Sequence, residues 1–141
     1  MKPIDIGPVD HVNMYVNNLE ESVSFYQRVF GTDVLPKEQG FAKGIKWCII
    51  GIPDKFYFCL YQMQSPQTHQ PDSLHINHIG FYVPDFDATV ERIKTLGVEI
   101  QYQGRPIEWH NSGGGSSRSL YIKDPNGYYI EFSEHFGGGL H

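Results

Sequence analysis

The sequence contains an internal repeat, which limits the possible folds more than any other feature of the chain. An alternating segment around His11 precedes an amphipathic segment that ends in glycine, and the same succession returns around His78. Each copy continues with three short strand-like segments, so the repeat predicts an α+β fold of two βαβββ modules with concave sheets. A histidine at the same point of both copies suggests one metal site shared by the two modules.

The first copy shows this pattern clearly. Val9–Val16 alternates as a strand that places His11 on one face and Val12 on the other. Asn18 is a candidate helix N-cap, and Gly31 is a suitable terminator. The predicted helix has an apolar stripe, and strands follow it near Asp33–Pro36, Ile45–Ile52 and Phe56–Met63, the last two joined by a turn at Pro53-Asp54.

The second copy repeats the order. Ile76–Val83 alternates as a strand with His78 opposite Ile79, Asp85 or Asp87 can cap the next helix, and Gly97 ends it. The remaining strands are predicted near Val98–Tyr102, Ser119–Lys123 and Tyr128–Ser133, with a turn at Asp124–Gly127 between the last two.

These patterns predict a single domain over residues 1–141, the usual size of one domain. Module one spans about 7–64, a polar linker 65–75, module two about 76–134 and a tail 135–141. Gly104–Ser117, which contains three consecutive glycines, is predicted to be a long loop beside the site.

Aligning the two copies at their turns predicts which positions correspond. Pro53 matches Pro125, whereas His11 matches His78 with a spacing that is five residues shorter. Module two therefore contains about five extra residues, which we place in the glycine-containing loop. On this alignment Cys59 corresponds to Glu131, so a thiol in module one stands where module two has a carboxylate.

Composition excludes several classes of protein. The net charge is −5 and no basic patch is evident, so we expect no nucleic-acid partner. The chain has no apolar run of about 20 residues, so we expect no membrane association. Met1–Asp5 lacks the apolar core of a signal peptide, and two cysteines make no disulfide framework, so we expect a cytoplasmic protein.

Four segments together resemble the vicinal oxygen chelate superfamily, which contains glyoxalases, extradiol dioxygenases, fosfomycin-resistance proteins and bleomycin-binding proteins. They are the two histidine strands, Leu19–Tyr26 and Leu120–Glu131, and the resemblance covers nearly the whole chain. It implies paired βαβββ modules that form an open cup around a metal ion, and a homodimer. The metal ligands that it implies are His11, His78 and Glu131.

The chain departs from the subgroups of this family. Cys59 occupies the position where glyoxalases usually have a fourth ligand, a glutamate. No arginine or lysine follows Lys123, although fosfomycin-resistance proteins have an arginine after the last ligand. Tyr121 matches a tyrosine near the metal of extradiol dioxygenases, but their catalytic histidine has no convincing counterpart before His78.

Other residues allow two interpretations. Tyr121 either lines the site or hydrogen-bonds a substrate oxygen. His110 is either a solvated loop residue or a general acid and base carried by a mobile loop. Arg118 either binds an anionic substrate group or lies at a strand edge, and Cys59 is either a buried thiol or a soft ligand that favours zinc.

The sequence therefore predicts a metal-dependent enzyme that chelates two adjacent oxygens of a small-molecule substrate. Lyase or isomerase chemistry and ring-cleaving dioxygenase chemistry both stay open. The cofactor would be one divalent ion of iron, manganese, nickel or zinc. The alternative is a metal-free protein that sequesters an aromatic or drug-like ligand, as bleomycin-binding relatives do.

Overall fold

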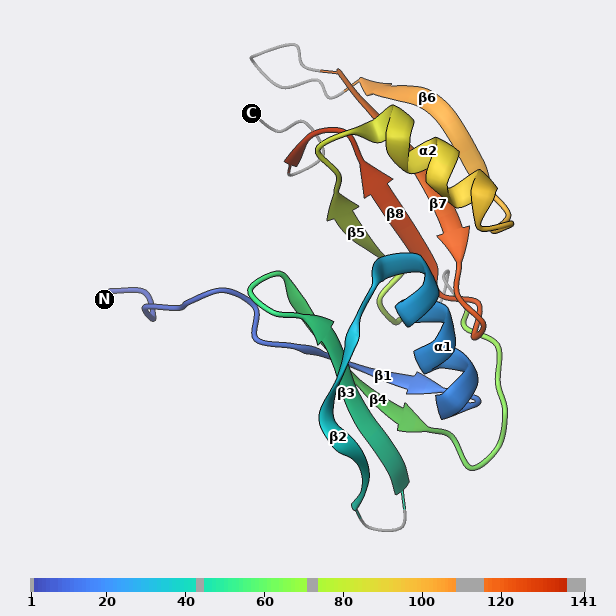
Figure 1. Cartoon of the computed structure of the whole chain (residues 1–141). Helices are drawn as coiled ribbons and strands as arrows, with labels where there is room; N and C mark the ends of the chain where they lie inside the picture. The colour runs from blue at the N-terminus through green and yellow to red at the C-terminus, as the bar shows by residue number, and fades with distance from the viewer. Residues whose placement is uncertain (1, 43–44, 71–73, 109–115, 137–141) are drawn as a thin grey trace. The chain divides into compact units, whose positions relative to one another are not determined.

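The computed structural model describes residues 2–42, 45–70, 74–108 and 116–136. His110 and most of the glycine-rich segment, residues 109–115, lie outside the described residues. The chain divides into two compact units, Met1–Gln67 and Thr68–His141, which we call module one and module two. Figure 1 shows one helix and one four-stranded sheet in each. The prediction of an α+β fold with two βαβββ modules is confirmed.

Module one contains a mixed sheet in the order β1-β4-β3-β2. β1 is parallel to β4, and the other neighbours are antiparallel. The single helix, α1, follows β1 and packs on one face of this sheet. The bounds of the elements are β1 Val12–Val16, α1 Leu19–Phe30, β2 Asp33–Ala42, β3 Ile45–Ile52 and β4 Phe56–Gln62.

Both ends of α1 are formed as the sequence predicts. The side chain of Asn18 accepts a hydrogen bond of 3.0 Å from the backbone N–H of Glu21, which satisfies one of the free donors of the first turn. Gly31 adopts the left-handed conformation, with φ +70°, and its N–H binds the carbonyl of Gln27. Residues with side chains are disfavoured at this φ, which explains why the helix stops at a glycine.

The core of module one lies between α1 and one face of the sheet. The helix contributes Leu19 and Tyr26, both fully buried, and the ring of Tyr26 contacts Phe58 of β4. The sheet contributes alternate residues of its strands, since successive side chains point to opposite faces. These buried strand residues are Met14, Val16, Cys48, Ile50, Phe58 and Leu60.

Module two repeats this arrangement. Its sheet has the order β5-β8-β7-β6, with β5 parallel to β8, and α2 packs on one face. The buried residues of α2 are Phe86, Val90 and Ile93, and those facing them from the sheet include Leu120, Ile122, Ile130 and Phe132. The bounds are β5 His78–Tyr82, α2 Phe86–Thr95, β6 Tyr102–Glu108, β7 Ser116–Lys123 and β8 Tyr129–Ser133.

Asp85 is the N-cap of α2, and its side chain accepts a 2.9 Å hydrogen bond from the N–H of Ala88. The turn between β7 and β8 is organised by Asp124, whose carboxylate accepts from the backbone N–H groups of Asn126 and Tyr128. Gly127 has φ +89°, a conformation that favours glycine. These local interactions match the patterns read from the sequence.

Two predictions for module two are wrong. Val98–Gln101 is not a strand, because the ladder with β7 begins at Tyr102, opposite Tyr121. Gly104–Ser117 is not one long loop, because β6 extends to Glu108 and β7 begins at Ser116. Pro106 cannot donate a backbone hydrogen bond, but β6 is an edge strand with an irregular register, and edge strands tolerate proline. For the same reason β2 continues past Pro36 to Ala42.

The register of the two sheets agrees with the repeat alignment. Asn13 pairs with Cys59 between the parallel strands of module one, and Gly80 pairs with Glu131 in module two. Asn13 and Gly80 each lie two residues after the repeated histidine, so their partners Cys59 and Glu131 occupy equivalent positions. The extra length of module two falls between Tyr102 and Tyr121, whose equivalents in module one are also paired across a hairpin.

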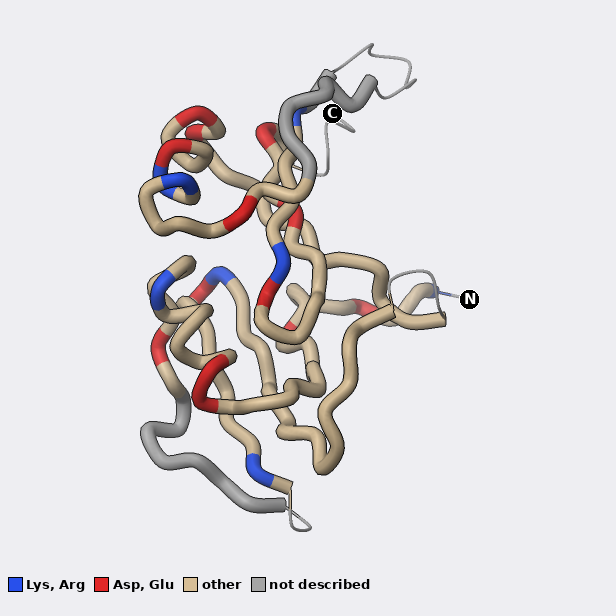
Figure 2. Tube along the Cα trace, turned by 90° about the vertical axis from the view of Figure 1, so that its right-hand side faces the viewer, with Lys and Arg blue, Asp and Glu red and all other residues tan. Residues whose placement is uncertain are grey.

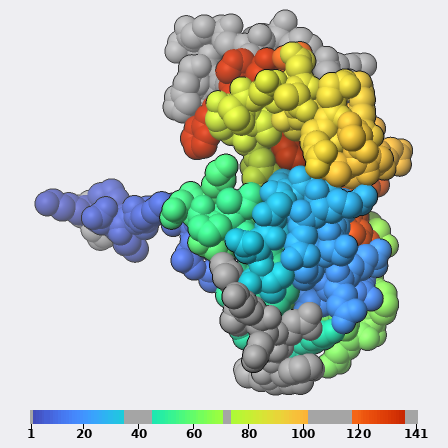
Figure 3. Space-filling model, in the orientation of Figure 1, coloured from blue at the N-terminus to red at the C-terminus, as the bar shows by residue number. Residues whose placement is uncertain are grey.

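At the start of module one, residues 2–8 form an extended segment that leads away from its sheet (Figures 1 and 3). Ile4 and Ile6 of this segment are exposed. Charged residues are distributed over both modules without a basic cluster in the described parts (Figure 2). None of the helices in the described parts is long and apolar enough to span a membrane.

Candidate metal centre

Each sheet has one face covered by its helix and a second face that we call the open face. In module two, His78, Tyr121 and Glu131 all lie on the open face, since their neighbours Ile79, Ile122 and Ile130 alternate to the helix side. Tyr121 pairs directly with Glu131, across β7 and β8. Strand register therefore brings these side chains together from three strands.

His78 and Glu131 are in direct contact. Nε2 of His78 lies 3.0 Å from Oε2 of Glu131, and the Glu131 side chain is only 12% exposed. Gly80, next to Glu131 in the ladder, leaves room for this carboxylate: a Cβ at Gly80 would lie 3.4 Å from Oε2. The two polar atoms therefore converge on one point of the open face.

The other ring nitrogen of His78 is already engaged. Nδ1 lies 2.8 Å from Oδ1 of Asn77, an oxygen that can only accept, so Nδ1 carries the proton. Nε2, the second ring nitrogen, is directed at the carboxylate of Glu131. A carboxylate only accepts, so either a proton on Nε2 or a cation joins the two groups.

Module one orients its histidine in the same way. Nδ1 of His11 lies 2.6 Å from Oδ2 of Asp10, which leaves Nε2 without a partner among the described residues. Asp10 and Asn77 are repeat equivalents, each immediately before its histidine. Metal-binding histidines usually donate their second N–H to such an oxygen, which sets the tautomer and the ring orientation. The sequence analysis missed these two residues, although their shared place in the repeat was a visible signal.

Tyr121 extends the cluster of module two. Its ring is 5.4 Å from that of His78 at 83°, and 6.4 Å from that of Tyr129, in edge-to-face contacts. Lys123 lies over the ring of Tyr129 at 4.9 Å. Tyr121 is thus a neighbour of both predicted ligands in this module.

The predicted ligand set is divided between the modules. Module two brings His78 and Glu131 together, whereas His11 belongs to module one. Neither module unites three His, Cys, Asp or Glu side chains suited to a metal ion among its described residues. His110, the predicted general acid and base, lies outside the described residues.

At the position equivalent to Glu131, module one carries a neutral group. Cys59 is a free, buried thiol, and burial raises its pKa, an effect that a hydrogen bond with Asn13 partly offsets. Asn13 stands where module two has Gly80. The glycine and carboxylate pair of module two, Gly80 and Glu131, is thus replaced in module one by the amide of Asn13 and the thiol of Cys59. Burial and a neutral thiol both agree with the interpretation of Cys59 as a buried side chain.

Arg118 is engaged in contacts that hold the fold of module two together. Its guanidinium binds Glu134 at 2.9 Å and Asp87 at 3.0 Å, and it lies 4.7 Å from the ring centre of Phe86. These contacts tie β7 to α2 on the helix side of the sheet, away from His78. They favour the strand-edge interpretation of Arg118.

Comparison with known proteins agrees with this architecture. The family model described as the Glyoxalase/Bleomycin resistance protein/Dioxygenase superfamily matches residues 9–132. The chain therefore belongs to this superfamily. The resemblance to the vicinal oxygen chelate superfamily, which the sequence motifs suggested, is confirmed.

Particular members of the family are similar to the chain at about one residue in four. A lactoylglutathione lyase of Neisseria meningitidis is 26% identical over 134 residues, with 91% of each chain covered. The fosfomycin resistance protein FosX of Listeria monocytogenes is 26% identical over 132 residues, covering 89% of this chain and 88% of FosX. A FosX variant solved with Mn(II) and 1S,2S-dihydroxypropylphosphonic acid superimposes with a TM-score of 0.66, at 23% identity, covering 93% and 94% of the two chains.

Proposed function

We propose that the protein is a metal-dependent enzyme in which His11, His78 and Glu131 hold one divalent cation. The observation that carries the proposal is the repeated bracing of both histidines through Nδ1, which leaves Nε2 of each available as a ligand. The same bracing at the equivalent position of both copies favours a shared role in metal binding over two unrelated structural roles.

The donors of module two fit a cation. Two ligands that bind one ion at right angles, each at about 2.1 Å, are about 3 Å apart. Nε2 of His78 and Oε2 of Glu131 have this spacing, at 3.0 Å. Two imidazoles and one carboxylate leave coordination positions open, which a chelating substrate requires. Iron, manganese, nickel and zinc all accept this donor set, and the Mn(II) of the FosX complex is consistent with it.

The cation would supply Lewis-acid stabilisation of negative charge on two adjacent substrate oxygens. The protein's own groups would orient the substrate and move protons. Tyr121, whose ring contacts that of His78, would donate its hydroxyl proton to a substrate oxygen. His110 remains the second candidate for proton transfer, from a segment outside the described residues. Lyase or isomerase chemistry and ring-cleaving oxygenation are the two reaction classes that this arrangement supports.

The proposed partner is a small-molecule substrate, and the proposed assembly is a homodimer in the cytoplasm. His11 completes the site together with His78 and Glu131, either within one chain or between two. The rival function is metal-free sequestration of an aromatic or drug-like ligand. It predicts a protein that holds no metal and turns over no substrate.

Metal analysis separates the two functions. Protein purified without chelator and then exposed to each candidate metal should bind about one ion per chain by elemental analysis. Glu131→Gln should lose most of this metal, because it replaces an anionic ligand with a weak neutral one. Glu91→Gln, an exposed substitution on α2, is the control and should retain it. Equal metal content in wild type and Glu131→Gln would remove Glu131 from the site.

A further inference from the structure

Two residues of the predicted linker pack on the turn between β7 and β8. The backbone N–H of His69 donates to the carbonyl of Asn126 at 3.2 Å, and the imidazole of His69 lies 4.5 Å from the ring of Tyr128. A Cβ at Gly127 would lie 3.3 Å from the side chain of Thr68, so the chain runs directly over this turn. Nδ1 of His69 is buried. His69 is therefore a packed side chain of module two, although the sequence pattern placed it in a polar linker.

The turn is a firm support for His69. The carboxylate of Asp124 accepts hydrogen bonds of 2.8 Å and 2.9 Å from the backbone N–H groups of Asn126 and Tyr128. Asp124 and Asn126 are both buried, and hydrogen bonds to a charged acceptor are stronger than those between neutral groups. β8 starts immediately after Tyr128, so a group that rests on this turn has a fixed place relative to the start of β8.

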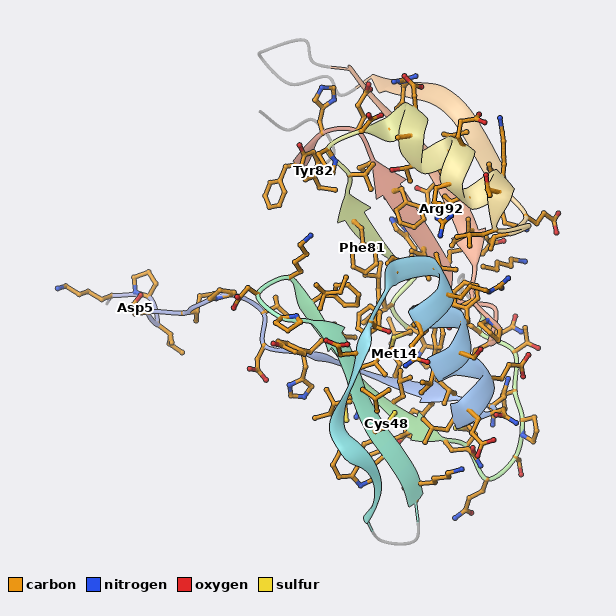
Figure 4. All side chains as sticks on the ribbon, viewed as in Figure 1. Asp5, Met14, Cys48, Phe81, Tyr82 and Arg92 are labelled. Atoms are coloured by element: carbon orange, nitrogen blue, oxygen red, sulfur yellow. The ribbon has the colours of Figure 1, made fainter. Side chains whose placement is uncertain are left out.

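His69 also reaches the segment that leads into β5. Its Nε2 lies 2.8 Å from the carbonyl oxygen of Ile76, and since a carbonyl only accepts, Nε2 donates its proton to this oxygen. β5 begins at His78 and ends at Tyr82, which Figure 4 labels. Ile76 and Asn77 precede the ladder with β8, which starts at His78. The hydrogen bond from His69 therefore holds the backbone just before Asn77, the residue that braces His78 through Nδ1.

Together these contacts enclose Asn77 from two sides. On one side, the ladder pairs His78 with Tyr129, the first residue after the turn. On the other side, His69 connects the turn to the carbonyl of Ile76. Oδ1 of Asn77 lies between them, 2.8 Å from Nδ1 of His78. Because a hydrogen bond weakens steeply with poor distance or angle, a shift of the backbone at Ile76 would weaken this brace.

We propose that His69 is a positioning residue of the metal centre. Through the carbonyl of Ile76 it holds Asn77 where its side chain accepts the Nδ1 proton of His78, and this directs Nε2 of that ring at the metal site. Groups that orient a ligating histidine affect metal affinity although they do not touch the metal. The inference rests on the proposed function for the statement that the oriented ring binds a metal, whereas the positioning of Asn77 needs none.

The first measurement uses the metal-free, full-length chain labelled with ¹⁵N. His69→Phe keeps a ring beside Tyr128 but removes the donor, whereas His69→Gln keeps an N–H donor near the place of Nε2 but removes the ring. We expect the backbone order parameters of Ile76 and Asn77 to fall in His69→Phe and to stay near those of wild type in His69→Gln. Unchanged order parameters along β8 confirm that the sheet is intact in both variants.

The second measurement is metal affinity, by competition with a chromogenic chelator. We expect His69→Phe to weaken binding about threefold, a smaller loss than that of the brace itself, and His69→Gln to bind as wild type does. In an Asn77→Ala background, His69→Phe should have no further effect, because the residue through which it acts has lost its side chain. His75→Phe, the same substitution at an exposed histidine of this segment, is the matched control and should change nothing.

Three results would overturn the inference. Equal behaviour of His69→Phe and His69→Gln would assign the effect to the ring contact instead of the hydrogen bond. Unchanged metal affinity in His69→Phe would show that the metal centre does not depend on this contact. Additive losses in the double variant would mean that His69 acts by a route other than Asn77. A wild type that binds no metal would instead overturn the proposed function, and the order parameters would still decide whether His69 holds Asn77.

Discussion

Nε2 of His78 lies 3.0 Å from Oε2 of Glu131, and Nδ1 of the same ring is held by Asn77 at 2.8 Å. Nδ1 therefore orients the ring, and Nε2 faces the carboxylate of Glu131. In module one, Nδ1 of His11 is held by Asp10 in the same way as Nδ1 of His78 is held by Asn77. The two bracing residues are the parts of the site with the most direct consequences for metal binding.

Removing a brace should weaken metal binding without changing the ligands. We expect Asn77→Ala and Asp10→Ala each to lower metal affinity by about tenfold or more, the usual effect of losing a partner of a ligating histidine. Competition with a chromogenic chelator measures this affinity. Asp54→Ala, in the exposed turn between β3 and β4, is the control. Unchanged affinity in both brace variants would show that the histidines need no orientation.

Cys59 should not be a required ligand. Cys59→Ser keeps a small polar side chain beside Asn13 and removes the thiol, and we expect metal affinity to change by less than about tenfold, since the proposed site uses other donors. The same chelator competition, with circular dichroism as the folding control, checks this. A larger loss in a folded variant would make Cys59 a ligand and would favour zinc.

The stability of the protein should fall above pH 9 because of Cys48. Burial raises the pKa of this thiol from 9.0 to about 11, with Cys59 adding to the effect and Lys46 opposing it. The folded state therefore holds its proton at a pH where the unfolded chain releases it. The stabilising contribution is complete below pH 9 and is lost as the pH rises through about 11.

The measurement is the melting temperature of wild type and Cys48→Val between pH 8 and pH 11. The valine retains an apolar side chain of similar size but cannot ionise, so its melting temperature should decline less steeply. Parallel curves for the two proteins would show that the thiol does not titrate differently in the folded and unfolded states.

Arg118→Lys should reduce stability and spare the site. Lysine cannot reproduce the forked contacts with Glu134 and Asp87 or lie flat over Phe86, so we expect the melting temperature to fall by about 2–6 °C. The lysine variant should keep its metal content, because Arg118 lies on the helix side of the sheet. Loss of metal with unchanged stability would reverse this assignment.

The contact between Arg118 and Glu134 also predicts that part of the stability is lost at acid pH. It holds the pKa of Glu134 below its usual range, mainly through hydrogen bonds from its guanidinium and backbone N–H. This contribution is present above the ordinary carboxyl pKa and is lost as the pH falls through the lowered value. The difference in melting temperature between wild type and Arg118→Lys should therefore shrink at acid pH.

His110→Gln tests the predicted proton-transfer role. Once a substrate is known, we expect the turnover number to fall by about 10²-fold or more while the melting temperature is unchanged, as expected for a lost acid or base. A kinetic profile identical to that of wild type would make His110 an ordinary surface residue. Tyr121→Phe is then the next variant, since its ring already contacts His78.

Local sequence determined much of this protein. Asn18 and Gly31 bound the first helix because capping depends on a few adjacent residues. Strict alternation assigned His78 to the open face, whereas His11 lies just before β1, which begins at Val12 and not at Val9. The spacing of the repeated turns matched Cys59 with Glu131 in the repeat. Each of these inferences needs only the two-residue period of side chains along a strand and the chemistry of turns. A shift of one residue in register would move every side chain of a strand to the opposite face.

Only the tertiary structure decided the rest. The length of β6 depends on its pairing with β7, which outweighs the local preference of Pro106 for a loop. The partners of Arg118 come from α2 and the end of β8, 31 and 16 positions away in the chain. The contact of His78 with Glu131 joins residues 53 positions apart. Such features depend on distances through space between segments that are remote in sequence, and a one-dimensional pattern does not contain those distances.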